Sequence, residues 1–111
     1  MARTRATLDI YKGLTIAIPE SELGSGKTLT AKWSTLKAGN PTSLTAIGTP
    51  KTATASASAY TITYTPSDLA TDLGTYNNQT VYLHVYDSAV WRDTYPYVVS
   101  TTDEDVATVT P

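Results

Sequence analysis

The stretch from Ala59 to Asp87 limits what this 111-residue chain can fold into more than any other part of it. Aromatic or aliphatic residues alternate with threonine from Tyr60 to Thr65, and aliphatic residues alternate with tyrosine and histidine from Val81 to Tyr86. A period of two is typical of strands that bury one face. The stretch therefore predicts two strands of a β-sheet joined by a short connection.

That connection has the marks of a short helix near 66–73. Pro66 suits the first helical position, and Thr65 or Ser67 can cap the free amides at the helix start. Gly74 is a natural stop. A strand, a short helix and a second strand in this order indicate one layer of a β-sandwich.

Shorter strand patterns occur on both sides of this stretch. The clearest one places Leu29, Ala31 and Trp33 on one face of a strand that starts near Lys27. Other strands are expected over 7–11, over 14–18 after a kink or bulge at Gly13, over 44–47 with an end at 48–50, and over 90–100. The segment 52–59 fits either a strand or a connection. Turns are expected over 20–26 and 38–41. About seven short strands predict an all-β, immunoglobulin-like antiparallel β-sandwich.

The chain length fits a single domain with one core. We expect a sandwich domain over 7–100, an N-terminal arm over 1–6 and a C-terminal arm over 101–111. Pro96 places the last strand at a sheet edge or in a bulge. The residues assigned to the core are Leu29, Trp33, Ile62, Val81, Leu83 and Val85.

Composition argues against several classes of partner. A net charge of -2 with 16% charged residues lacks the clustered Lys and Arg of a nucleic-acid binder. No stretch is apolar enough for a membrane span or a signal peptide, so we expect a soluble protein made in a cytoplasm. Because the chain has no cysteine, it has no disulfide and no thiolate ligand for a metal.

Three motifs resemble chemical sites and are interpreted as structural. The run from Gly24 to Thr28 is similar to the end of a phosphate-binding loop, but Ser21 replaces a glycine of that motif and a strand pattern follows instead of a helix. His84 has no converging nucleophile or acid, so it is interpreted as a surface or interface histidine. The acidic run 103–105 lacks the spacing of a calcium loop and is interpreted as a solvated tail. We therefore expect no catalytic residue, no cofactor and no metal.

Tyrosines are the side chains that most suggest a contact surface. Tyr82, His84 and Tyr86 share one strand face, and Tyr95 and Tyr97 share a face of the next strand. Such rings suit protein contacts, and aromatic faces also stack on sugars. Alternatively, the rings cover the second side of a thin sandwich.

The order of these patterns resembles small immunoglobulin-like structural proteins of tailed bacteriophages, in the baseplate, tail and head-decoration class. The resemblance covers about 7–100 and is carried by the segments LDIYKGLTIAI, GKTLTAKW, YTITYTPSDLATDLGTY and VYLHVYD. Its motifs include no catalytic residue.

This resemblance implies a non-enzymatic virion protein that decorates or cements the capsid or forms part of the tail. It implies contacts with major capsid or tail proteins and with other copies of the chain, and the terminal arms suit the addition of a strand to a neighbour's sheet edge. A carbohydrate-binding or adhesive module is the alternative. The expected contact residues are Arg3, Arg5, Tyr82, His84, Tyr86, Tyr95 and Tyr97.

Overall fold

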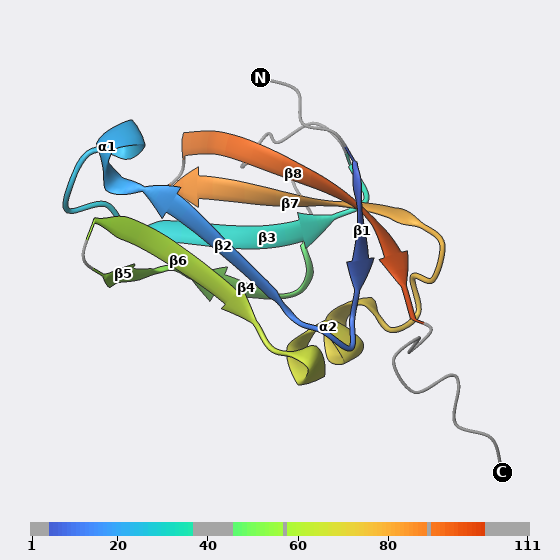
Figure 1. Cartoon of the computed structure of the whole chain (residues 1–111). Coiled ribbons are helices and arrows are strands. Elements are labelled where there is room, and N and C mark those ends of the chain that lie inside the picture. Colours follow the sequence, from blue (N-terminus) through green and yellow to red (C-terminus); the bar gives the residue numbers. More distant parts are fainter. Residues whose placement is uncertain (1–4, 37–45, 57, 89, 102–111) are drawn as a thin grey trace, which may run out of the picture.

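Two β-sheets form the body of the protein (Figure 1). The computed structural model describes residues 5–36, 46–56, 58–88 and 90–101. Its strands are β1 (Ala6–Asp9), β2 (Leu14–Pro19), β3 (Leu29–Ser34), β4 (Ile47–Thr52), β5 (Thr54–Ser56), β6 (Ala59–Tyr64), β7 (Thr80–Asp87) and β8 (Val90–Ser100), and its helices are α1 (Glu20–Leu23) and α2 (Pro66–Leu73). The five-stranded sheet has the order β1-β8-β7-β3-β4, and the three-stranded sheet has the order β2-β6-β5.

This strand order confirms the predicted all-β, immunoglobulin-like sandwich. In that fold strands B, E and D share one sheet, and strands C, F and G share the other. Here β2, β6 and β5 form the first group, and β3, β7 and β8 form the second, with β4 added at its edge. One pairing departs from the predicted antiparallel arrangement, because β1 runs parallel to β8.

The kink or bulge predicted at Gly13 takes the form of a corner between the two sheets. β1 belongs to the five-stranded sheet and β2 to the three-stranded sheet, so the chain crosses the sandwich in the four residues between them. Asp9 accepts hydrogen bonds from the backbone of Tyr11 and Lys12, which tightens this turn. Gly13 has φ +75°, and a Cβ there would lie 3.0 Å from the carbonyl oxygen of Tyr64. Glycine fits both requirements.

The core lies between the sheets and is closed at one end by α2. All six residues predicted for the core are buried. Trp33 on β3 packs its ring 5.4 Å from that of Tyr64 and 5.8 Å from that of Tyr97. Leu69 and Leu73 of α2 are also fully buried. The core is therefore built from both sheets and the helix, without a disulfide.

The predicted helix occurs over Pro66–Leu73. Thr65 caps it, because its hydroxyl accepts a hydrogen bond from the Asp68 amide while the Asp68 carboxylate accepts one from the Thr65 amide. This reciprocal pair satisfies two amides that the helix itself cannot pair. The short helix α1 was not expected, since Glu20–Leu23 lies inside a predicted turn.

Two further boundaries differ from prediction. The strand expected to end at 48–50 continues as β4 through Gly48 and Pro50 to Thr52. β4 is an edge strand with a register shift against β3, and an edge tolerates a proline whose missing N–H faces outward. The 52–59 segment contains the short strand β5 and the start of β6. The turn expected at 38–41 lies outside the described residues.

The ends of the chain are described only in part. β1 begins at Ala6 and β8 ends at Ser100. Most of the predicted arms, 1–6 and 101–111, lies outside the described residues, as do Arg3 and the acidic run 103–105. No helix in the described part of the chain is long and apolar enough to cross a membrane.

Candidate functional site

The predicted tyrosine surface divides between the two faces of the five-stranded sheet. Residues directly opposite one another in neighbouring antiparallel strands point to the same face. Tyr95 pairs with Leu83, and Tyr97 pairs with Val81, so both tyrosines face the core, against which they are partly buried. Tyr95 and Tyr97 therefore share a face, as expected, but it is the core face and not the face that carries the aromatic residues of β7.

The opposite face of β7 carries a continuous row of rings, which we call the outer row and define as Tyr82, His84 and Tyr86. The centroids of the Tyr82 and His84 rings lie 6.2 Å apart with planes inclined by 19°, and those of His84 and Tyr86 lie 6.4 Å apart. The Nζ of Lys32 on β3 lies 5.1 Å from the centre of the Tyr86 ring. The row thus forms ring contacts along one strand and a cation–π contact across to the next.

Two members of the outer row are not accessible. Relative exposure is 0% for His84 and 1% for Tyr86, while Tyr82 is half-buried. Of the predicted surface or interface position of His84, the surface position is wrong, because neighbouring groups enclose the ring. A carbonyl from the segment after β3 reaches His84 on one side, and a threonine of β8 reaches it on the other.

His84 lies in a hydrogen-bonded chain. Its Nε2 lies 2.8 Å from the carbonyl oxygen of Leu36, and its Nδ1 lies 2.7 Å from Oγ1 of Thr94. The same hydroxyl accepts a hydrogen bond of 2.8 Å from Nε1 of Trp91. A carbonyl can only accept and an indole nitrogen can only donate, so Nε2 carries a proton and donates to Leu36. Nδ1 then accepts from Thr94, and the chain satisfies a neutral imidazole.

Burial lowers the pKa of His84, and the hydrogen bond with the Leu36 carbonyl opposes this effect. The direction of the pKa agrees with the hydrogen-bonding pattern, since a protonated Nδ1 could no longer accept the O–H of Thr94. His84 is thus held neutral and fully engaged, which favours a structural role over proton transfer.

An exposed apolar group lies next to this chain of hydrogen bonds. Val90 and Trp91 follow the turn between β7 and β8 and are 54% and 46% exposed. Leu36 is 55% exposed, and its carbonyl belongs to the same hydrogen-bonded chain as the Trp91 ring. Trp91 pairs with Tyr86 and shares the outer face, whereas Val90 pairs with Asp87 and points to the opposite face. We call Leu36 and Trp91 the hairpin patch. The sequence placed Val90 and Trp91 in the last strand but gave no sign of their exposure.

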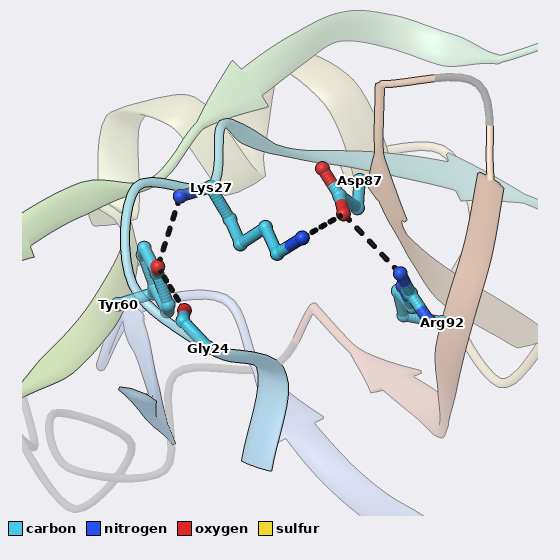
Figure 2. Close-up of polar contacts among 5 residues, drawn as sticks. All are labelled: Gly24, Lys27, Tyr60, Asp87 and Arg92. Carbon is cyan, nitrogen blue, oxygen red and sulfur yellow. Dashed lines mark hydrogen bonds and ion pairs between the residues drawn. The ribbon is translucent and has the colours of Figure 1, made fainter. Parts of the chain in front are cut away.

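The phosphate-loop-like segment is used to hold the end of the sandwich together (Figure 2). The hydroxyl of Tyr60 donates to the carbonyl oxygen of Gly24 at 2.6 Å and accepts from the backbone amide of Lys27 at 3.0 Å. The segment leads into β3 rather than into a helix. This context agrees with the interpretation of a turn, because phosphate binding by such a loop requires a helix amino terminus behind it.

Two cations share one carboxylate at the same end of the molecule. Oδ2 of Asp87 lies 3.6 Å from Nζ of Lys27 and 3.3 Å from a guanidinium nitrogen of Arg92 (Figure 2). Asp87 ends β7, Lys27 precedes β3 and Arg92 lies on β8, so the three residues tie adjacent strands at their ends. The lysine is thereby engaged with a carboxylate.

Other sequence-predicted contact residues occupy separate places. Arg5 precedes β1, and its guanidinium donates a hydrogen bond of 3.0 Å to Oγ1 of Thr80 at the start of β7. In the described part of the chain, no group of three or more His, Cys, Asp or Glu side chains is arranged to hold a metal ion. The hairpin patch is therefore the candidate contact site, with Tyr82 as the partly accessible member of the outer row.

Comparison of the chain with protein-family models, with curated proteins and with solved structures gives no match.

Proposed function

We propose that this chain is a non-enzymatic virion structural protein that decorates or cements a capsid or forms part of a tail through protein–protein contacts. The observation that carries the proposal is the hairpin patch, where the Leu36 and Trp91 side chains are exposed beside the hydrogen-bonded chain of His84 on the outer face of β7. Apolar and aromatic residues that are exposed together at one place suit a contact with another protein.

A structural role is also supported by the titratable side chains, whose polar atoms are engaged within the fold. Both ring nitrogens of His84 are occupied, and Lys27 and Asp87 pair with each other. A catalytic site needs a nucleophile or base free to meet a substrate. These groups instead hold the loops and strand ends in place, as expected of a protein whose function is to keep its shape.

The proposal extends to location and partners. The chain is made in the host cytoplasm and resides in the virion, in many copies, against major capsid or tail proteins. It binds neither nucleic acid nor membrane in this role, in keeping with a net charge of -2. The resemblance of the strand and helix order to small phage structural proteins gives the proposal its particular setting.

Particles released from cells that carry this gene provide the test. An antibody against the chain should label purified particles at regular positions on the head or tail in electron micrographs. The double variant Leu36→Ser/Trp91→Ser should be depleted from particles, whereas Tyr11→Ser should be incorporated normally. Tyr11 is a matched control because it is 47% exposed and lies in the turn after β1. Absence of the chain from purified particles would refute the proposal.

A carbohydrate-binding or adhesive module is the second candidate, favoured by the exposure of the Trp91 ring. Sugar binding there should change the tryptophan fluorescence of the wild type and not that of Trp91→Ala. Trp33 provides a constant background because it is buried. A fluorescence response retained in Trp91→Ala would argue against sugar binding at this ring.

A further inference from the structure

The free edge of β2 differs from the other sheet edges of the protein. β2 pairs with β6 along all six of its residues, and no strand in the described part of the chain pairs with its other side. This edge is left open because β1 crosses to the other sheet and pairs with β8. Among the described residues it is therefore a full-length strand edge whose outward backbone groups have no strand partner.

The remaining edges carry features that discourage strand addition. β1 has four residues and ends in Asp9, and β5 has three residues. β4 contains Pro50 and Lys51 and has a register shift against β3. The part of β8 that extends beyond β1 contains Arg92, Asp93 and Pro96. Charges, prolines, irregular register and short length all protect edges from pairing.

β2 has none of these protective features before its last residue. Its sequence is LTIAIP, without a charged residue and with proline only at the end. The side chains of Thr15 and Ala17 are exposed, while those of Ile16 and Ile18 are buried in the core. An added strand would therefore meet a regular, uncharged neighbour.

The backbone groups that point toward the open edge can be assigned from the pairing with β6. The Glu20 amide donates to the Ser58 carbonyl, directly after the Pro19–Ala59 pair. Hydrogen-bonded and non-hydrogen-bonded pairs alternate along an antiparallel ladder. Even-numbered residues of β2 thus bond to β6, and Thr15 and Ala17 direct both N–H and C=O away from it. Pro19 directs its carbonyl outward as well.

We propose that residues 106–110 of a second copy of this chain pair antiparallel with the open edge of β2. These residues read VATVT, an uncharged strand pattern that sits in the ten residues following the described structure. From Ala107 to Thr110 apolar residues alternate with threonine, so Ala107 and Val109 can continue the apolar face of β2 that carries Ile16 and Ile18. This inference rests on the multi-copy part of the proposed function and names the contact between copies.

For antiparallel pairing, a second copy fits better than the chain's own tail. Ser100 and Leu14 line the same cavity, so the tail leaves the domain beside the start of β2. To pair antiparallel with its own β2, the tail would need to pass along about 20 Å of strand and then turn back. Residues 101–105 are too few, because a two-residue turn leaves three residues that span about 10 Å. The tail of a neighbour can approach from the other end.

Two proline variants of the full-length chain test the contact by sedimentation velocity. Ala17→Pro removes an outward N–H without breaking a bond to β6, and Ala17→Thr keeps that N–H as the matched control. Thr108→Pro disrupts the donor strand, and Thr108→Val is its control. Wild type and both controls should associate with the same concentration dependence. Each proline variant should associate about tenfold more weakly or worse, with unchanged thermal unfolding at low concentration.

Mixing the two proline variants gives the decisive result. Ala17→Pro has an intact tail and Thr108→Pro has an intact edge, so the mixture should form a 1:1 heterodimer that neither variant forms alone. Association of Thr108→Pro by itself would overturn the proposal in favour of direct β2–β2 pairing between copies. A wild type that stays monomeric would overturn it in favour of an unoccupied edge or pairing with its own tail. Incorporation of the chain into particles is measured separately, so either result leaves the proposed function to its own test.

Discussion

The two faces of β7 are buried in different ways. On the inner face Val81, Leu83 and Val85 lie in the apolar core against Trp33. On the outer face His84 and Tyr86 are equally inaccessible, but His84 is enclosed by a carbonyl, a hydroxyl and neighbouring rings. Apolar burial stabilises a fold in proportion to area, whereas a buried polar group mainly recovers the hydrogen bonds that it lost from water. Equal burial therefore does not mean equal contribution to stability.

Removal of the largest inner-face neighbour should have the greatest effect. Trp33→Ala should lower the free energy of unfolding by about 3 to 5 kcal/mol, because it leaves a large cavity between the sheets. Trp91→Ala, the matched change at the hairpin patch, should cost about 1 kcal/mol or less. Urea denaturation followed by circular dichroism measures both. Similar losses for the two variants would contradict the contrast between the faces.

Removal of the outer-row imidazole should have an intermediate effect. His84→Ala should cost about 1 to 3 kcal/mol, because the Thr94 hydroxyl and the Leu36 carbonyl lose their partner. Thr94→Val keeps the shape of the side chain, removes one link of the chain and should cost about 1 kcal/mol. The same denaturation experiment applies. A loss for His84→Ala as large as that for Trp33→Ala would mean that the outer face is packed as a second core.

Acid should lower the free energy of unfolding through the outer-row residue His84. The pKa of His84 is lowered from its ordinary value near 6.5 by burial, so below that pH the unfolded chain binds a proton more readily than the folded chain. The free energy of unfolding should therefore fall as the pH drops through 6.5 toward the lower pKa of the folded state. Denaturation at pH 7.5, 6.5 and 5.5 should show this fall, and His84→Gln should reduce it. An equal pH dependence in the two proteins would exclude His84 as the source.

The ion cluster at the end of β7 should contribute least. Asp87→Asn should change the free energy of unfolding by less than about 1 kcal/mol, because the Lys27 and Arg92 side chains are 35% and 40% exposed. The difference from wild type should shrink further in 1 M salt, which screens exposed charges. A larger, salt-independent loss would show that the cluster acts through packing or strand geometry.

Local patterns were sufficient to predict much of this fold. The helix over Pro66–Leu73 and its Thr65 cap follow from neighbouring residues, and the strand β7 follows from its period of two. The change of sheet at Gly13 could not be predicted in this way. A glycine between two apolar alternations fits a bulge as well as a corner, and only the pairing of β1 with β8 distinguishes them.

The candidate site was less predictable because it depends on what covers the outer face. Alternation assigned Tyr82, His84 and Tyr86 correctly to one side of β7, but it does not tell whether that side meets solvent. Coverage of His84 comes from Leu36 and Thr94, which are 48 and 10 residues away in sequence. Likewise, Tyr95 and Tyr97 were placed by the register between β7 and β8, which the separate strand patterns do not fix.

The parallel pairing of β1 with β8 also determines how the domain bears a pulling force. The N-terminal side of the chain enters at the start of β1, and the C-terminal side leaves at the end of β8 (Figure 1). When two parallel neighbours are pulled from these opposite ends, tension runs along the strands and loads their hydrogen bonds together in shear. β1, whose pairing with β8 leaves the edge of β2 open, is thus placed where it resists the separation of the two ends of the described chain.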